Sequence, residues 1–219
     1  MATFVLIHGA GDVAWYWHLM ETELRERGHD VIAVNLPCDD DSAGLAEYTD
    51  AVVHAIGDRT GLVVVGQSLG GFTAPLVCAR LPVDMLVLVA AMVPSPGETG
   101  EDWWTNTGYD QAIADGDERD GGDIATFYAD VQPDLAMEAL AKGRDQSATP
   151  MREPWPLEAW PDVPTRYLLC SQDRMFPAEW TRRMVRERLG IIPDEIDSGH
   201  TPALSHPKEL ADRLEAYRL

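Results

Sequence analysis

Residues 62–71 read Leu62-Val63-Val64-Val65-Gly66-Gln67-Ser68-Leu69-Gly70-Gly71. The first four of these residues form an aliphatic run that predicts a strand buried on both faces. The residues after Ser68 predict a helix that continues to about Arg80. A serine on the turn between such a strand and such a helix, flanked by glycines, is typical of an exposed nucleophile. The stretch therefore predicts that Ser68 is the nucleophile of a serine hydrolase.

Strands and helices alternate on both sides of this stretch. Short apolar runs predict strands at 3–7, 30–36, 85–90 and 166–170 and a short one at 191–196, and helical patterns cover about 15–27, 45–56 and 207–217. Such alternation indicates an α/β protein with a mostly parallel sheet and helices on both faces. A chain of 219 residues is the size of one domain.

The segment 95–162 interrupts this rhythm because it holds no convincing buried strand. It contains four of the seven tryptophans, and its 16 acidic residues outnumber four basic ones. We expect a short helical lid inserted within the single domain 1–219. Its tryptophans either line a substrate pocket or fasten the insertion to the body. Trp103 and Trp104, with Gln67 beside the nucleophile, are the candidate pocket residues.

A serine nucleophile needs a base, and His200 is the candidate. It stands in a loop between the last predicted strand and the last predicted helix, after the serine and the acid in chain order, as a triad on this kind of fold requires. The other histidines have structural explanations; His8, for example, is expected to brace the loop after the first strand.

The acid that orients His200 is expected to be Asp173, which directly follows the predicted strand 166–170. Asp162 precedes that strand and Asp194 lies inside the last one, so both are weaker candidates. Glu98, which follows the strand 85–90, is the more serious alternative.

Two backbone N–H groups are needed to stabilise the oxyanion of the reaction. We expect them from Leu69, the residue after the nucleophile, and from Ala10 in the loop His8-Gly9-Ala10-Gly11. The plainer interpretation of this loop is an ordinary glycine-rich turn. It matches neither of the glycine-rich phosphate-binding motifs.

The composition limits the partners of the protein. Its 37 acidic and 17 basic residues give a net charge of −20, which opposes nucleic-acid binding. The charge indicates either a solubilising surface or adaptation to a salt-rich host. The start of the chain resembles no signal peptide, no run is long enough to cross a membrane, and three unpaired cysteines suggest a reducing compartment. We expect a cytoplasmic monomer or homodimer that acts on a small molecule without a metal or other cofactor.

The chain resembles the small α/β-hydrolases, in particular the plant-type esterases and hydroxynitrile lyases and their bacterial relatives. The resemblance covers nearly the whole chain and is most specific at four places: residues 4–11, the Ser68 turn, Gln172-Asp173 with Phe176-Pro177-Ala178-Glu179-Trp180, and Gly199-His200. It is weakest across 95–162. The resemblance implies an α/β-hydrolase fold and the triad Ser68, His200 and Asp173.

Two positions separate this chain from the lyases that it resembles. Those lyases carry threonine in place of Gly9 and lysine in place of Thr201, and they use both residues on their substrates. We therefore expect hydrolysis of an ester with a small to medium, apolar acyl or alcohol group. A small-molecule receptor with weak turnover, and a lyase or carbon–carbon hydrolase that uses the same triad, are the alternatives.

Overall fold

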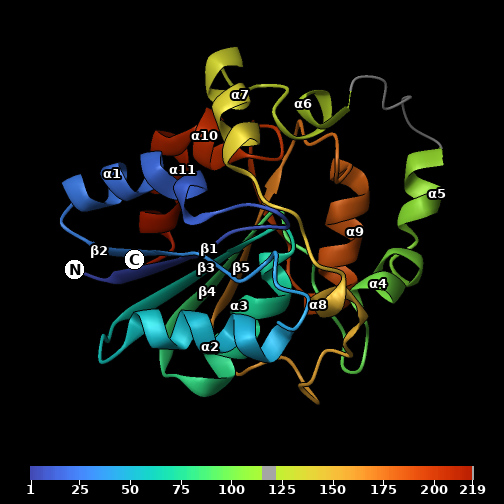
Figure 1. Ribbon diagram of the computed structural model, residues 1–219, viewed down its shortest axis with the longest axis horizontal. Coiled ribbons are helices and arrows are strands. Elements are labelled where there is room, and N and C mark those ends of the chain that lie inside the picture. The colour runs from blue at the N-terminus through green and yellow to red at the C-terminus, as the bar shows by residue number, and fades with distance from the viewer. Residues whose placement is uncertain (115–121, 219) are drawn as a thin grey trace.

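The computed structural model describes residues 1–114 and 122–218, and it confirms an α/β-hydrolase fold. Six strands form one parallel sheet in the order β2-β1-β3-β4-β5-β6. Their bounds are β1 Thr3–Ile7, β2 Asp30–Val34, β3 Leu62–Gln67, β4 Val83–Val89, β5 Thr165–Cys170 and β6 Asp194–Ile196. In Figure 1 these strands run side by side through the centre of the molecule.

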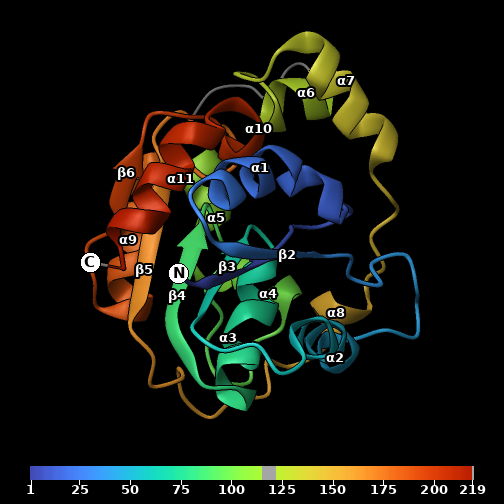
Figure 2. The same ribbon diagram turned by 90° about the vertical axis from the view of Figure 1, so that its left-hand side faces the viewer.

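Helices cover both faces of this sheet, as Figures 1 and 2 show from two sides. One face carries α1 (His18–Glu26), α10 (Pro202–Ser205) and α11 (Pro207–Ala216), and the other carries α2 (Leu45–Ile56), α3 (Gly70–Arg80) and α9 (Ala178–Leu189). Side chains of one strand alternate between the two faces. Phe4 and Leu6 of β1 pack toward α1 and α11, whereas Val5 and Ile7 pack toward α2 and α3. A strand buried on both faces explains why these runs are apolar throughout.

The predicted elements differ from the observed ones mainly at their ends. The first helix starts as a 3-10 turn, η1 (Ala14–Trp17), before α1 begins at His18. The last strand is shorter than the predicted 191–196, because Ile192 is 81% exposed and only residues 194–196 pair with β5. Cys38 and Cys170 are buried and Cys78 is partly buried.

The segment between β4 and β5 forms short helices at the end of the sheet where the strands finish. They are α4 (Gly100–Asn106), α5 (Tyr109–Ala114), α6 (Gly122–Phe127), α7 (Pro133–Lys142) and α8 (Thr149–Arg152). In both views α6 and α7 lie beside α10, while α4 and α8 lie on the other side of the ends of the strands. We refer to residues 95–162 as the insertion; residues 115–121 within it lie outside the described part of the chain.

No helix within residues 1–114 and 122–218 has the length and apolar character needed to cross a membrane.

Candidate active site

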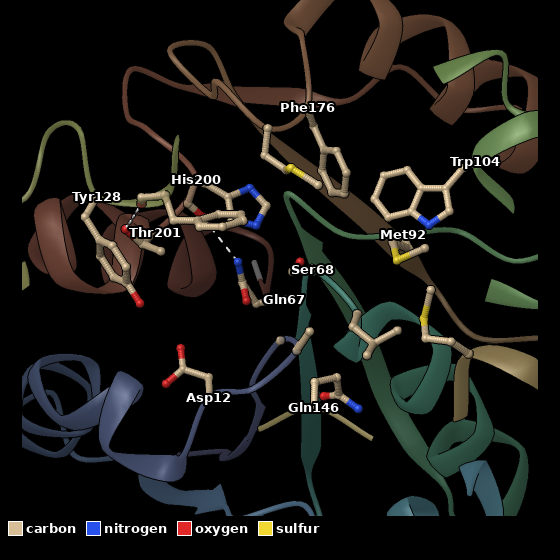
Figure 3. Close-up of a pocket in the computed structure, with 16 residues that line it drawn as sticks. Asp12, Gln67, Ser68, Met92, Trp104, Tyr128, Gln146, Phe176, His200 and Thr201 are labelled. Atoms are coloured by element: carbon tan, nitrogen blue, oxygen red, sulfur yellow. Dashed lines mark hydrogen bonds between the residues drawn. The ribbon is translucent and has the colours of Figure 1, made fainter. Parts of the chain in front are cut away.

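A cavity of about 330 Å³ lies where the carboxyl ends of the strands meet the insertion. Functional sites of parallel α/β sheets lie at this edge. Figure 3 shows Ser68 near its centre, with His200 on one side and Trp104 on the other. The lining residues come from strand-end loops and from the insertion: Gly9, Ala10, Asp12, Gln67, Ser68, Leu69, Met92, Trp104, Phe127, Tyr128, Gln146, Met151, Met175, Phe176, His200 and Thr201.

Ser68 lies on a strained turn between β3 and α3. Its φ of 51° is in the left-handed region that residues with a side chain rarely adopt. Its carbonyl accepts hydrogen bonds from the N–H groups of Gly71 and Met92, both at 3.0 Å, which fix the turn. A Cβ at Gly66 would lie 2.8 Å from Ala74 Cβ and 2.9 Å from Gly70 O, so strand and helix meet this closely only with glycine there. The turn therefore presents the serine hydroxyl to the cavity.

His200 and Asp173 form a buried pair beside Ser68. His200 Nδ1 lies 2.8 Å from Asp173 Oδ2, and the two side chains are 3% and 1% exposed. The other carboxylate oxygen of Asp173 accepts hydrogen bonds from the N–H groups of Met175 (2.7 Å) and Phe176 (3.0 Å). Because Nδ1 faces the carboxylate, Nε2 is the imidazole nitrogen left for Ser68, which lines the same cavity.

Aromatic rings and a side-chain amide hold the imidazole in place. The rings of Phe127 and Phe176 lie 5.4 Å and 5.3 Å from the ring of His200, measured between centroids. Gln67 donates a hydrogen bond from Nε2 to the carbonyl of His200 at 3.2 Å, which Figure 3 marks with a dashed line. The predicted pocket residue Gln67 therefore both lines the cavity and contacts the backbone of His200.

The residues on either side of His200 are bonded to the insertion. Gly199 donates its N–H to Asp130 Oδ2 at 2.6 Å, and Thr201 donates its hydroxyl to the carbonyl of Phe127 at 2.7 Å. A Cβ at Gly199 would lie 2.5 Å from Asp130 Oδ1, so any other residue there would displace the Asp130 carboxylate. The insertion thus fixes the loop that carries His200.

The N–H groups of Ala10 and Leu69 are the predicted oxyanion hole. Both residues line the cavity, and neither N–H donates a hydrogen bond to another described residue. Leu69 is the N-cap of α3, where helix N–H groups are free and attract negative charge.

His8 braces the loop that carries Ala10. Its Nε2 accepts a hydrogen bond from the N–H of Leu36 at 3.1 Å, so its Nδ1 donates to the carbonyl of Gly9 at 2.8 Å. Burial lowers the pKa of His8 to about 4. The neutral ring therefore holds one tautomer at physiological pH.

The competing acids are placed elsewhere. Glu98 is buried and bonded to Arg188 at 2.7 Å and 2.8 Å, and it also accepts from Asn106 Nδ2 at 2.8 Å. Neither Asp162 nor Asp194 lines the cavity. Of the four candidate acids, only Asp173 contacts the histidine that shares the cavity with Ser68.

The two tryptophans predicted to line a pocket differ in position. Trp104 lines the cavity, but Trp103 does not, so that expectation was wrong for Trp103. Trp103 is fully buried, donates its indole N–H to the carbonyl of Val93 at 3.0 Å, and packs at 5.5 Å against the ring of Trp180. Successive residues of a helix point in directions about 100° apart, so the two neighbours face different surroundings.

Several lining residues were not predicted from the sequence. They are Asp12, Met92, Phe127, Tyr128, Gln146, Met151 and Met175. Burial raises the pKa of the Asp12 carboxyl to about 6, against the opposing effect of the Val13 N–H. The one feature of the sequence that could have indicated Asp12 is its position directly after the glycine-rich loop 8–11. Within residues 1–114 and 122–218, no group of three or more His, Cys, Asp or Glu side chains is arranged to hold a metal ion.

The six-stranded parallel sheet covered by helices on both faces, with Ser68 on the turn after β3, is the architecture of an α/β hydrolase. The model of the alpha/beta hydrolase family matches residues 4–213, so the chain belongs to that family. Norfluorocurarine synthase 1 from Strychnos sp is 24% identical over 260 aligned residues, covering 97% of this chain and 93% of that protein. Methylesterase 3 from Arabidopsis thaliana is 25% identical over 248 aligned residues, covering 96% of this chain and 93% of that protein.

The solved structures that resemble this chain include an esterase. The crystal structure of polyneuridine aldehyde esterase superposes with a TM-score of 0.83 at 21% identity and covers 100% of both chains. This likeness concerns the fold.

Proposed function

We propose that the protein is a carboxylic ester hydrolase in which Ser68, His200 and Asp173 form the catalytic triad. The observation that carries the proposal is the cavity into which a strained turn presents Ser68 beside the His200–Asp173 pair at 2.8 Å. The esterases among its relatives and structural neighbours support the same reaction.

The proposed reaction has two steps. Ser68 Oγ attacks the ester carbonyl while His200 Nε2 takes its proton, and the N–H groups of Ala10 and Leu69 stabilise the oxyanion. His200 then gives the proton to the departing alcohol, which leaves an acyl group on Ser68. Water, deprotonated by His200, releases the acid. Asp173 holds the tautomer of His200 and stabilises its imidazolium form.

The lining of the cavity favours a small to medium, largely apolar ester. Its volume of about 330 Å³ is small for a ligand site. Met92, Met151, Met175 and Trp104 supply much of its wall. Methionine side chains adapt to differently shaped apolar groups. We propose that the insertion acts as a lid that sets which acyl and alcohol groups fit.

Gly9 and Thr201 disfavour lyase chemistry. A Cβ at position 9 would lie 2.6 Å from Gln67 Oε1 and 2.9 Å from Ser68 Cβ, so the threonine of the related lyases does not fit here without movement. Thr201 carries no charge for a departing cyanide, and its hydroxyl is engaged by Phe127. Absence of mandelonitrile cleavage is the expected result; efficient cleavage would instead favour a lyase.

The test is Ser68→Ala, assayed on p-nitrophenyl acetate and butyrate. We expect kcat/KM to fall by about 10⁴-fold or more, since the attacking atom is lost. Ser42→Ala is the matched control, because the Ser42 hydroxyl is exposed and bonded to Asp40. A fluorophosphonate probe is expected to label Ser68 stoichiometrically. Near wild-type activity of Ser68→Ala would refute the nucleophile, and an unlabelled protein without esterase activity would favour a receptor.

A further inference from the structure

Asp12 is the one carboxyl group among the described residues that line the cavity. It follows the loop that carries Ala10, and it has no role in the proposed triad or oxyanion hole. In Figure 3 its carboxyl group points toward the phenol of Tyr128, on the side of Ser68 opposite to Trp104 and Met92. The cavity therefore has an apolar side and a side that ends in a carboxyl group.

Among the described residues, no lysine or arginine forms an ion pair with the carboxyl group of Asp12. Its Oδ1 accepts a hydrogen bond from the N–H of Val13 at 2.8 Å, and none of the described lining residues is lysine or arginine. Burying a carboxylate without a compensating charge is unfavourable, as the raised pKa of Asp12 reflects. The side-chain oxygen of an asparagine could accept the hydrogen bond from the Val13 N–H equally well. This hydrogen bond therefore does not explain why a charged group faces the cavity. A cationic group of a substrate at the Asp12 end of the cavity would supply the compensating positive charge.

The surroundings of Asp12 also favour a cation. The hydroxyl end of Tyr128 lies toward the carboxyl group, so a second oxygen with a partial negative charge adjoins the place where a cation would sit. A second hollow adjoins this end of the cavity, shares Asp12 and Tyr128, and is also lined by Asp39, Asp123 and Asp145. Arg144, the one cation among the described residues that line this hollow, is already bonded to Asp39 at 3.0 Å and to the Leu36 carbonyl at 2.8 Å.

We propose that Asp12 is a specificity-determining residue that selects esters carrying a cationic amine, whose positive charge lies beside its carboxylate at the Tyr128 end of the cavity. The inference rests on the proposed ester hydrolysis, since the carbonyl of the same molecule has to reach Ser68. It narrows the substrate class from apolar esters to apolar esters with one ammonium group.

The test compares two esters that differ in one charge. Butyrylcholine and 3,3-dimethylbutyl butyrate have nearly the same shape, but only the first carries a positive charge, which is independent of pH. We expect the ratio of their kcat/KM values to fall by about tenfold from wild type to Asp12→Asn, since a partly buried ion pair is lost. Asp12→Glu, which keeps the charge, is expected to retain part of the preference.

Comparing ratios separates this role from a structural one. A variant with a disturbed site loses rate on both esters, and the different intrinsic reactivities of the esters cancel between variants. Asp134→Asn is the control because it removes one exposed negative charge from α7, and it is expected to leave the ratio unchanged. A ratio for Asp12→Asn within about twofold of wild type overturns the proposal.

A binding measurement distinguishes failure of this inference from failure of the proposed function. If neither ester is hydrolysed by the wild type, benzyltrimethylammonium is titrated calorimetrically into wild type, Asp12→Asn and Asp134→Asn. Binding about tenfold weaker in Asp12→Asn alone would support the cation site while the ester hydrolysis fails. Equal affinity in all three proteins would overturn the site as well.

Discussion

The two walls of the cavity are built in different ways. The body wall consists of loops at strand ends, and backbone hydrogen bonds and close glycine contacts fix the positions of Ser68 and Ala10. The insertion wall consists of side chains from short helices and from the segments between them, such as Trp104 of α4 and Tyr128 directly after α6. The difference suggests that the body determines which reaction takes place and the insertion determines which molecule enters. Substitutions in the two walls should therefore change different kinetic constants.

The largest effect is expected in the body wall, from Asp173→Asn. Asparagine keeps the shape but favours the wrong tautomer of His200, so kcat is expected to fall by about 10⁴-fold. The measurement is steady-state hydrolysis of p-nitrophenyl butyrate by protein whose folding is verified by circular dichroism.

Glu98→Gln is the matched variant for the competing acid. Removing the buried charge that pairs with the partly buried Arg188 is expected to lower the free energy of unfolding by about 3–5 kcal/mol. Turnover per folded molecule should be unchanged. The opposite pattern, with activity lost in Glu98→Gln and kept in Asp173→Asn, would exchange the two roles.

The body wall was largely predictable from the sequence because its signals are local. Aliphatic runs marked the strands, and in a parallel sheet the residues after each strand meet at one edge, which brings Ser68, Asp173 and His200 together. Ser68 and His200 line one cavity, and Asp173 contacts His200 from outside that lining. Their catalytic roles are the proposal that the Ser68 and Asp173 variants test.

The insertion wall was much less predictable. Its helices are short, so no long periodic pattern showed which face of each is buried. The sequence could not distinguish Trp103 from Trp104, and it gave no indication that Phe127 would contact His200. Asp12 was overlooked because a charged residue after a glycine-rich turn is ordinary in a loop. Only its position in the folded chain shows that it faces the cavity.

Trp103 and Trp104 provide the next comparison, within the insertion itself. Trp103→Ala is expected to lower the free energy of unfolding by about 3–5 kcal/mol, since a fully buried ring is removed. Trp104→Ala is expected to raise KM for butyrate esters, because Trp104 faces the cavity, and to lower the free energy of unfolding less than Trp103→Ala does. Urea denaturation and ester kinetics on both variants check this. Equal losses of stability with unchanged KM values would contradict the assigned positions.

A smaller effect is expected where the two walls meet, at Asp130. Asp130→Ala removes the acceptor of the Gly199 N–H, which should loosen the His200 loop and lower kcat by about tenfold with little change in KM. Asp130→Asn still offers an oxygen to that N–H and is expected to recover most of the rate. A positioning role requires this rescue; identical kcat values for the two variants would rule it out.

The smallest effect is the pH dependence of charge selection. The pKa of Asp12 is raised to about 6, so its carboxylate form, and with it the preference for butyrylcholine, is present above that pH and lost below it. The groups that interact with Asp12 electrostatically, Tyr16, Tyr128 and Cys38, have pKa values raised by burial and stay neutral over this range.

The measurement is the ratio of kcat/KM values for butyrylcholine and 3,3-dimethylbutyl butyrate between about pH 8 and pH 5, where we expect a several-fold decrease. A change in the chemical step itself affects both esters and cancels in the ratio. Asp12→Asn should show a flat ratio, and a wild-type ratio that is equally flat would contradict the assignment.

The hydrogen bonds from Gly199 to Asp130 and from Thr201 to Phe127 also bear on how such enzymes can be re-engineered. Insertions are obvious units to exchange between family members when a new specificity is wanted. In this protein a transplanted insertion would also have to hold the loop of His200, the proposed proton acceptor. A chimera would therefore need an acceptor for the Gly199 N–H, a carbonyl opposite Thr201 and a ring against the imidazole before its new pocket could be used.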